Sequence, residues 1–241
     1  MSIATEITRL QTAKADIKTA IEAKGVTVPA SAKIDTYDNY VSQISGGGGG
    51  SEDLKKMIDR TITSIVIPSD ATTIGQYAFY GCSSLTSVTI PNSVTIIGGS
   101  AFSSTNILRV NSNTNGVVNI PSGVTTISGS SSFSSCRSIT SVTIPDSVTT
   151  IGNYAFYTCT SLRNVTIGSG VTSIGAAAFA YTNSITSFTC NAVTPPTLGS
   201  GILTNASANL VIYVPSASVD TYKAASGWSD YASKIQAIPN S

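Results

Sequence analysis

The chain has 241 residues, of which 13 are Lys or Arg, 12 are Asp or Glu and none is His, so its net charge is +1. Such a charge balance cannot neutralise many phosphates, which excludes nucleic acid as an expected partner. Without His the chain lacks the commonest general base and a common metal ligand, so we expect no metal and no cofactor. It contains no apolar run long enough to span a bilayer, so we also expect no membrane insertion.

Residues 1–45 have the pattern of a helical attachment or oligomerisation module. Aliphatic side chains recur at spacings of four and three over about Ile3 to Lys24, which predicts an amphipathic helix. A second, shorter helix is expected at about Ile34 to Ile44. The pair could form a hairpin that buries its own apolar stripe, or the heptad-like seam could form a coiled coil in a homo-oligomer, for which a trimer is favoured. The seam residues are Ile3, Ile7, Leu10, Ile17 and Ile21.

A glycine-rich linker is expected at residues 46–51. Its five consecutive glycines, Gly46–Gly50, should behave as flexible coil. Such runs occur in natural chains and in engineered fusions alike. Of the 25 charged residues, 16 lie in residues 1–60, and this change of composition marks a domain boundary.

Residues 52–215 contain five near copies of one segment, which indicates a solenoid. When the copies are aligned on their aromatic residue, the separations are 23, 31, 23 and 23 residues, so one copy carries an insertion of 8 residues. We expect this insertion to lengthen a loop at about Asn106 to Gly116. The aligned residues are Phe79, Phe102, Phe133, Phe156 and Phe179.

Each copy begins with a short strand and a turn. In the fourth copy Val142 and Ile144 flank Thr143, and this alternation predicts that the aliphatic side chains face inward and the threonine faces outward. A Pro or Gly then ends the strand, since Pro lacks the N–H needed to continue a ladder. Further aliphatic residues follow at equivalent positions, such as Ile151 and Leu162. We therefore predict a β-solenoid of parallel strands whose coils stack on one continuous apolar interior.

Residues 216–241 are expected to cap the solenoid, because an open end would expose its core to water. The apolar pattern of this segment predicts one or two short helices, with Trp228 packed on the last coil. The pattern residues are Val219, Tyr222, Trp228, Tyr231 and Ile235. The predicted fold class is therefore an α+β repeat protein, with N-terminal helices, a solenoid and a small helical cap.

Three surfaces of the solenoid are candidate ligand-binding sites. The first is the outward column of the strands, which is uncharged and rich in hydroxyls and could hydrogen-bond a glycan or a protein; equally, its threonines could be only good strand formers. The second is a stripe of tyrosines around the turns, represented by Tyr80 and Tyr157. The third is the insertion with Arg109. The outward column consists of Val66, Thr89, Asn119, Thr143, Thr166 and Thr189.

The positions of the cysteines and carboxylates give little indication of a disulfide or of a catalytic site. Cys82, Cys136 and Cys159 each follow the repeat Phe by three residues. Since stacked strands lie about 4.8 Å apart, the last two could form a disulfide, although a small buried hydrophobe is the commoner role of such a Cys. A glycoside hydrolase needs two facing carboxylates, and the repeats offer only Asp70 and Asp146, which both follow turn prolines. We therefore expect no enzyme activity.

The repeats resemble a known family. The run Leu85–Val94, followed by Ile97–Gly98 and Ala101–Phe102, closely resembles the BspA-type leucine-rich repeats of bacterial surface and phage proteins. The likeness covers about Thr61 to Pro215. It implies a curved parallel leucine-rich-repeat solenoid that is used for adhesion or ligand recognition and has no chemistry of its own.

The N-terminal segment resembles a second group of proteins. Its stretches Ala15–Val28 and Ile34–Tyr37 are similar to the leader module of phage tail-fibre and tail-tip proteins. In those proteins such a module implies attachment to other virion proteins, while the distal repeats meet the host surface.

Taken together, these features favour a bacteriophage virion protein, a tail-fibre or tail-tip component whose solenoid binds a bacterial surface protein or glycan. An exported adhesin would need a signal segment, yet charged residues interrupt the first 24 positions. The expected location is therefore the virion tail, after synthesis in the host cytoplasm. The alternatives are a bacterial cell-surface adhesin or host-interaction protein and, third, a polysaccharide-degrading tailspike.

Overall fold

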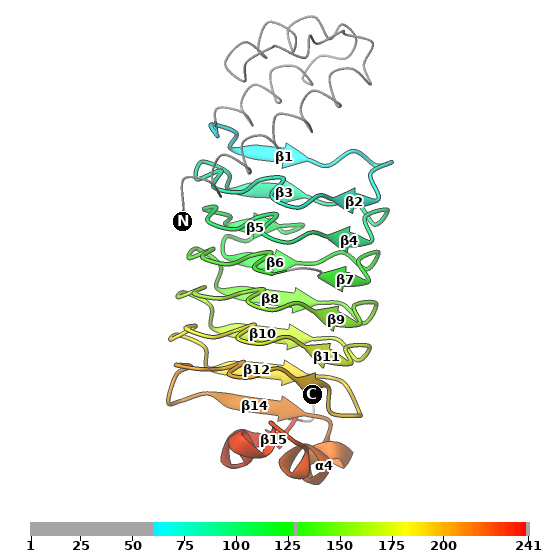
Figure 1. Cartoon of the computed structure of the whole chain (residues 1–241), viewed down its shortest axis with the longest axis vertical. Coiled ribbons are helices and arrows are strands. Elements are labelled where there is room, and N and C mark those ends of the chain that lie inside the picture. The colour runs from blue at the N-terminus through cyan, green and yellow to red at the C-terminus, as the bar shows by residue number, and fades with distance from the viewer. Residues whose placement is uncertain (1–59, 128–129, 240–241) are drawn as a thin grey trace, which may run out of the picture. The chain divides into compact units, whose positions relative to one another are not determined.

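The computed structural model describes residues 60–127 and 130–239, which form a parallel β-solenoid (Figure 1). Two sheets run along it, and neighbouring strands within each sheet are parallel. The predicted solenoid is therefore confirmed. The predicted N-terminal helices and glycine-rich linker lie outside the described residues.

The larger sheet has nine strands in the order β1-β3-β5-β6-β8-β10-β12-β14-β15. They are β1 (Ser64–Val66), β3 (Ser87–Thr89), β5 (Arg109–Val110), β6 (Val117–Asn119), β8 (Ser141–Ile144), β10 (Asn164–Ile167), β12 (Ser187–Cys190), β14 (Val211–Val214) and β15 (Ile235–Ala237). The smaller sheet has six strands, in the order β13-β11-β9-β7-β4-β2. They are β2 (Thr73–Ile74), β4 (Ile96–Ile97), β7 (Thr126–Ile127), β9 (Thr150–Ile151), β11 (Ser173–Ile174) and β13 (Thr197–Leu198). One strand of each sheet, with the turns between them, makes one coil.

Side chains from equivalent positions of successive coils fill the space between the two sheets. In β8, Val142 and Ile144 are buried whereas Thr143 between them is exposed, in agreement with the alternation. The six-stranded sheet adds a second buried column that includes Ile151, and the turn before the next large-sheet strand adds a third that includes Leu162. These columns continue from coil to coil, so the coils share one apolar interior.

The repeat phenylalanines form an uninterrupted stack along this interior. All five are at most 3% exposed, and the ring centroids of successive residues lie 5.1–5.2 Å apart with interplanar angles of 1–18°. Such spacings are favourable for aromatic pairs. Neighbouring coils are therefore joined by ring contacts as well as by backbone hydrogen bonds.

A column of threonines before the six-stranded sheet also joins the coils. The hydroxyl of Thr149 donates to the carbonyl of Thr125 at 3.4 Å, and that of Thr172 donates to the carbonyl of Thr149 at 3.2 Å. The same bond recurs along the column at Thr95, and Thr197 of β13 donates to the Thr172 carbonyl in a similar way. Since their hydroxyls are bonded within the protein, these threonines stabilise the turns.

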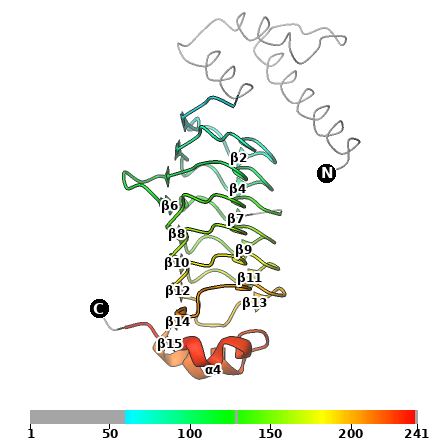
Figure 2. The same ribbon diagram turned by 90° about the vertical axis from the view of Figure 1, so that its left-hand side faces the viewer.

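The insertion departs from the predicted loop, because its first part is a strand. Arg109 of β5 pairs in register with Ser87 of β3 on one side and with Val117 of β6 on the other. In the six-stranded sheet β4 pairs directly with β7, so the insertion adds a strand to one sheet only. The remainder of the insertion, residues 111–116, leaves the sheet and projects from the column of strands (Figure 2).

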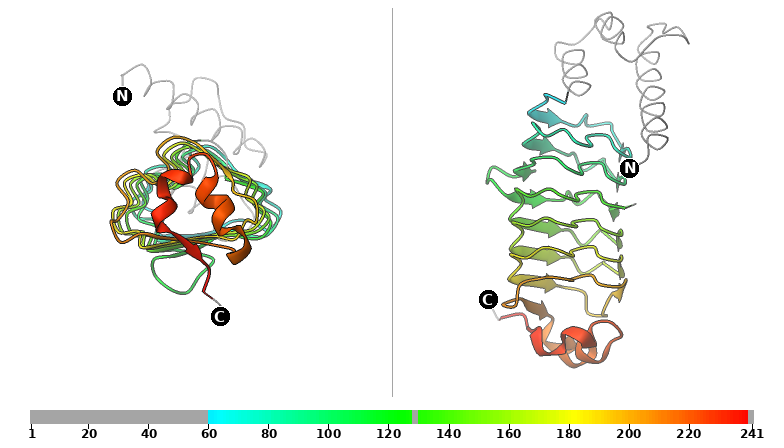
Figure 3. Two further views of the ribbon diagram at one scale, coloured as in Figure 1. Left: turned by 90° about the horizontal axis from the view of Figure 1, so that it is seen from below. Right: turned by 60° about the vertical axis from the view of Figure 1, so that its left-hand side comes forward.

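Short helices cross the end of the solenoid, which confirms the predicted cap (Figure 3). They are η2 (Ser216–Ser218), α4 (Val219–Ala224) and η3 (Ser229–Lys234). Trp228 is fully buried, with its Nε1 donating to the Pro196 carbonyl at 2.8 Å and its ring against Phe188 and Tyr222. One part of the prediction is wrong: Ile235 belongs to β15, which extends the nine-stranded sheet by pairing with β14.

The cysteine column is buried, and its thiols are free. The Cys136 thiol donates to the Phe102 carbonyl at 3.0 Å, and the Cys159 thiol donates to the Phe133 carbonyl at 3.2 Å. Burial raises the pKa of the Cys136 thiol to about 11, against the opposing effect of hydrogen bonds with Thr105. Of the two alternatives, the buried small side chain is therefore correct and the disulfide is not formed.

Candidate functional site

The outer face of the nine-stranded sheet carries most of the predicted ligand-binding residues. Thr143, Thr166 and Thr189 share one register position in β8, β10 and β12 and point outward. The column continues into Tyr213 of β14 and Gln236 of β15. Because adjacent strands lie about 4.8 Å apart, hydroxyl and amide groups repeat at that spacing along the face. A second outward column, two residues earlier in each strand, contains Ser141, Asn164, Ser187 and Val211.

The expectation that Thr89 and Asn119 are neighbours in this column is wrong, because β5 lies between their strands. Asn119 pairs with Thr143, so the unbroken column begins at Asn119 and runs toward the C-terminal cap. Thr89 is exposed and pairs with Val66 on the other side. The sheet face is thus divided into two parts by the insertion.

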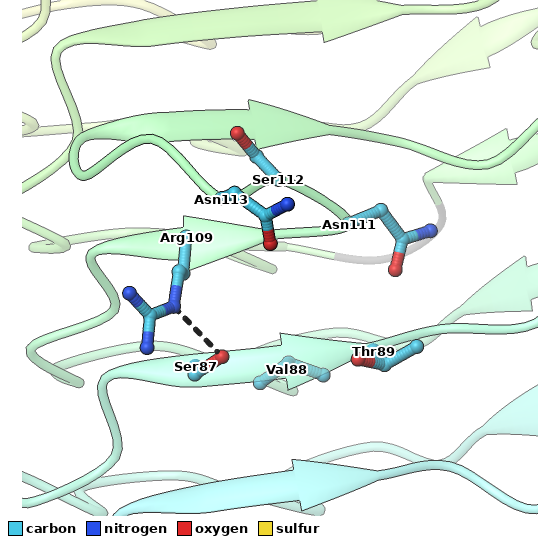
Figure 4. Close-up of a pocket in the computed structure, with 7 residues that line it drawn as sticks. All are labelled: Ser87, Val88, Thr89, Arg109, Asn111, Ser112 and Asn113. Atoms are coloured by element: carbon cyan, nitrogen blue, oxygen red, sulfur yellow. Dashed lines mark hydrogen bonds between the residues drawn. The ribbon is translucent and has the colours of Figure 1, made fainter.

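An open hollow of about 450 Å³ lies at this division. Figure 4 shows its lining, which comes from β3, from β5 and from the segment after β5. The side chain of Val88 is buried in the core, so that residue contributes only backbone, and every other lining residue is polar. The lining residues are Ser87, Val88, Thr89, Arg109, Asn111, Ser112 and Asn113.

Arg109 supplies the positive charge of the hollow. Its Nε donates to the Ser87 hydroxyl at 3.1 Å (Figure 4), and one terminal nitrogen donates to Oδ1 of Asn115 at 3.3 Å. The side chain is half-buried between β3 and the insertion. Among the outward strand positions of the nine-stranded sheet, which all lie in the described residues, no other side chain is charged. The insertion in the repeat predicts Arg109 as a ligand-binding residue but does not predict the hollow, since the hollow depends on strand β5.

Hydrogen bonds hold the wall of the hollow in place. Asn111 has a positive φ of 47°, a conformation that Asn tolerates better than most residues. Its side-chain amide pairs with the backbone of Ile90, accepting from N–H at 2.7 Å and donating to the carbonyl at 2.8 Å. Asn119 donates to the Asn111 carbonyl at 3.3 Å, and the Ser112 hydroxyl accepts the Thr114 N–H at 3.0 Å. The chain is therefore fixed where it leaves the sheet.

The tyrosines form two separate clusters rather than one stripe. In the first, the Tyr157 ring lies 5.5 Å from Tyr154 and 5.3 Å from Tyr181, and in the second Tyr77 lies 5.8 Å from Tyr80. Serines take the equivalent positions in the two coils between them, so the aromatic surface is interrupted. These serines are Ser100, Ser103, Ser131 and Ser134.

Comparison with known proteins identifies the family. A family model described as a BspA type leucine rich repeat region in six copies matches residues 58–124 and 111–208. The chain belongs to the BspA-type leucine-rich repeat family. Among solved structures, this BspA-type chain is similar to a leucine-rich repeat protein of T. pallidum at 29% identity, with a TM-score of 0.55 over 63% of this chain and 68% of the other.

Two further solved structures of leucine-rich repeat proteins are less similar to the chain. A leucine-rich repeat protein from Bacteroides ovatus is 20% identical, with a TM-score of 0.41 over 73% of this chain and 54% of that one. A leucine rich cell surface protein from Faecalibacterium prausnitzii is 21% identical, with a TM-score of 0.39 over 78% and 62%. Both superpose too loosely to bear on function. No curated protein matches the chain in sequence.

The BspA-type solenoid keeps its two turn carboxylates apart. Asp70 and Asp146 lie in coils at least three strand spacings from one another, roughly 14 Å, whereas glycosidase pairs are separated by about 5 to 9.5 Å. Asp146 is engaged in a turn, where it accepts the Ser169 N–H at 2.6 Å. The family model that matches does not describe an enzyme family. Within residues 60–127 and 130–239, no cluster of three or more potential metal ligands occurs, and none of the helices described there is long and apolar enough to cross a bilayer.

Proposed function

We propose that this protein is a non-catalytic binding protein of the bacterial cell surface, and that the outer face of its nine-stranded sheet binds a glycan or a protein of another surface. Membership of the BspA-type family supports surface display more directly than the virion location favoured by the sequence alone. A repeat solenoid with a continuous core is a scaffold for such a face, since its curvature and stacking create extended binding surfaces.

One contrast between threonines carries the proposal. The hydroxyls of Thr149 and Thr172 bond to backbone carbonyls in the turns. The hydroxyls of Thr143, Thr166 and Thr189 on the sheet face have no hydrogen-bond partner within the described part of the chain. They are therefore available to a ligand, and the stacked strands hold them in fixed positions, which lowers the entropic cost of binding.

The binding part of the proposal is tested by placing bulk and charge on this face. The full chain is applied to an array of cell-surface glycans and extracellular-matrix proteins, beside its Thr166→Lys and Thr143→Lys variants. Each variant should weaken the bound signal at least tenfold, because a long side chain blocks the flat face and must itself be desolvated. Ser200→Lys is the matched control, since Ser200 is exposed in a turn outside the sheet. Equal binding by Thr166→Lys and Ser200→Lys would contradict the proposal.

Surface display is tested by protease treatment of intact cells followed by immunoblotting against the solenoid. Loss of the band without lysis supports the proposal, and full protection inside intact cells contradicts it. A second candidate location is the phage virion, which the likeness of Ala15–Val28 to tail leader modules favours. Recovery of the chain in purified virions, and its absence from shaved cell surfaces, would select that candidate.

We also propose that the N-terminal seam self-associates, with a trimer as the favoured state, or contacts neighbouring virion proteins if the virion candidate is correct. The seam residues Ile7, Leu10 and Ile17 have a heptad-like spacing. Light scattering of the full chain should then give a multiple of its 24.7 kDa mass. The Leu10→Asp variant should give the monomer mass, and a monomeric parent chain would contradict self-association.

A further inference from the structure

We propose that the hollow beside β5 binds the carboxylate of an acidic glycan, with the Arg109 guanidinium as its partner. This inference rests on the proposed function, because it names a ligand class for one part of the same sheet face. The charge, the rigidity and the lining of the hollow each support it.

The charge of Arg109 has no counter-ion among the residues that the structure describes. In residues 60–127 and 130–239 Arg109 forms no ion pair, although its side chain is half-buried, and a partly desolvated cation without a partner is unfavourable. Its bonds to Ser87 and Asn115 hold the guanidinium plane and use two of its five N–H groups. Three N–H groups are left, and the planar fork matches a carboxylate that binds with both oxygens.

The hollow is formed before a ligand arrives. Its wall is the segment after β5. The side-chain amide of Asn111 fixes this segment to the backbone of Ile90, and the Ser112 hydroxyl accepts the Thr114 N–H within the segment. Gly116 at the end of this segment has a φ of 81°, and its carbonyl accepts the N–H groups of Thr140 and Ser141 in the next coil. A site that is already ordered loses little entropy on binding.

The lining favours a sugar over a peptide. Around Arg109 the hollow presents the hydroxyl of Thr89 and the amide of Asn113, and no apolar side chain. Protein partners are usually anchored by aromatic or aliphatic side chains in apolar pockets, which this hollow lacks. Beyond it the sheet face continues as the hydroxyl column that begins at Asn119 and Thr143, so a longer glycan would find further hydrogen-bonding groups.

The probes are a hyaluronan tetrasaccharide and 3′-sialyllactose, each paired with its methyl ester, together with a glutamate octapeptide and inorganic phosphate. Calorimetric titration of the full chain should show binding of at least one carboxylated oligosaccharide and at least tenfold weaker binding of its ester. Binding of neither oligosaccharide, or equal binding of acid and ester, would overturn the proposal. Equal or tighter binding of the octapeptide or of phosphate would also overturn it, since the site would then not select an acidic glycan.

Variants locate the site. Arg109→Gln should weaken binding of the acidic oligosaccharide at least tenfold, and Asn113→Ala should weaken it severalfold without lowering the melting temperature, because Asn113 is exposed and unbonded within the described residues. Arg163→Gln removes the same charge from an exposed position outside the hollow and should bind like the parent. If Thr166→Lys abolishes array binding while Arg109→Gln changes nothing, the proposed function stands and this inference fails. If the oligosaccharide binds through Arg109 but Thr166→Lys binds the array as well as Ser200→Lys does, the proposed function of the threonine column fails instead.

Discussion

Replacing Phe133 by Ala should destabilise the solenoid more than any comparable change at its described N-terminal end. Phe133 is fully buried and stacks on two rings, Phe102 at 5.1 Å and Phe156 at 5.2 Å. Truncation of a buried Phe to Ala typically costs about 3–5 kcal/mol, and each lost aromatic pair accounts for roughly 0.5–1.5 kcal/mol of such a loss. We expect the upper half of the range, because the backbone ladders on both sides prevent the coils from closing the cavity.

Phe79→Ala is the matched comparison, since Phe79 stacks on one ring only among the described residues, that of Phe102. Its cost should be smaller by about one aromatic pair, roughly 0.5–1.5 kcal/mol. Thr143→Ala, on the exposed face, should stay within about 0.5 kcal/mol of the parent.

The assay is urea unfolding of the full chain, followed both by far-ultraviolet circular dichroism and by the fluorescence of Trp228, the only Trp. Trp228 lies in the cap. If the circular dichroism and fluorescence curves of Phe133→Ala coincide, loss of a ring in the middle of the column destabilises the cap at its end as well. Equal destabilisation by Phe133→Ala and Phe79→Ala, or a loss below about 1 kcal/mol for either, would refute the reasoning that the ring stack couples the coils.

Two further predictions concern the cap and the buried thiols. Deletion of residues 216–241 should make the chain aggregate in size-exclusion chromatography, because Trp228 and Tyr222 cover the apolar end of the last coil; a soluble truncate that melts in one transition would contradict this. Above about pH 9 the thiol of Cys136 ionises in the unfolded chain but stays protonated in the native one, where its pKa is about 11, so stability should fall by about 3 kcal/mol between those values. Urea midpoints measured from pH 8.5 to 11 should decline less steeply for Cys136→Ala, and identical slopes would exclude this thiol as the cause.

The repeating interior could be predicted from the sequence because its signals are local. The alternation of Val142, Thr143 and Ile144 assigns each side chain to a face without knowledge of any distant residue, and a fixed 23-residue spacing places equivalent side chains above one another. The buried positions of Ile151 and Leu162 follow from the same two facts.

The irregular parts could not be predicted, because distant neighbours determine them. Strand β5 is only two residues long, so it has no alternation of apolar and polar residues that would predict a strand. It forms a strand because its backbone pairs with β3 on one side and with β6 on the other. No neighbouring residue in the sequence indicates that the side-chain amide of Asn111 forms the hydrogen bonds to Ile90 that a strand backbone would otherwise form. The same holds for β15, whose Ile235 fits a helical pattern equally well until β14 pairs with it. The interruption of the tyrosine stripe, in contrast, can be predicted from the sequence. When the copies are aligned, Ser100 and Ser131 occupy the position that Tyr77 and Tyr154 have in other copies.

The insertion is therefore the place where structure and function can be separated by one change, removal of residues 109–116. The deletion restores the 23-residue spacing and brings Val117 to the register position opposite Ser87 that Arg109 now occupies. The six-stranded sheet is already paired as though the insertion were absent, with β4 next to β7. Loss of the buried side chain of Val110 should cost about 1.5–3 kcal/mol, offset by eight fewer residues to order at about 1–2 kcal/mol each.

The shortened chain should consequently keep a single cooperative transition and binding through the Thr143 column, while losing all affinity for the carboxylated oligosaccharide. Circular dichroism melting and calorimetry on the same preparation measure both properties. An unfolded or aggregated product would show that β5 is a structural requirement of the stack. Retained oligosaccharide binding by a folded product would place the acidic-glycan site elsewhere on the solenoid, because the deletion removes both Arg109 and the wall that makes the hollow.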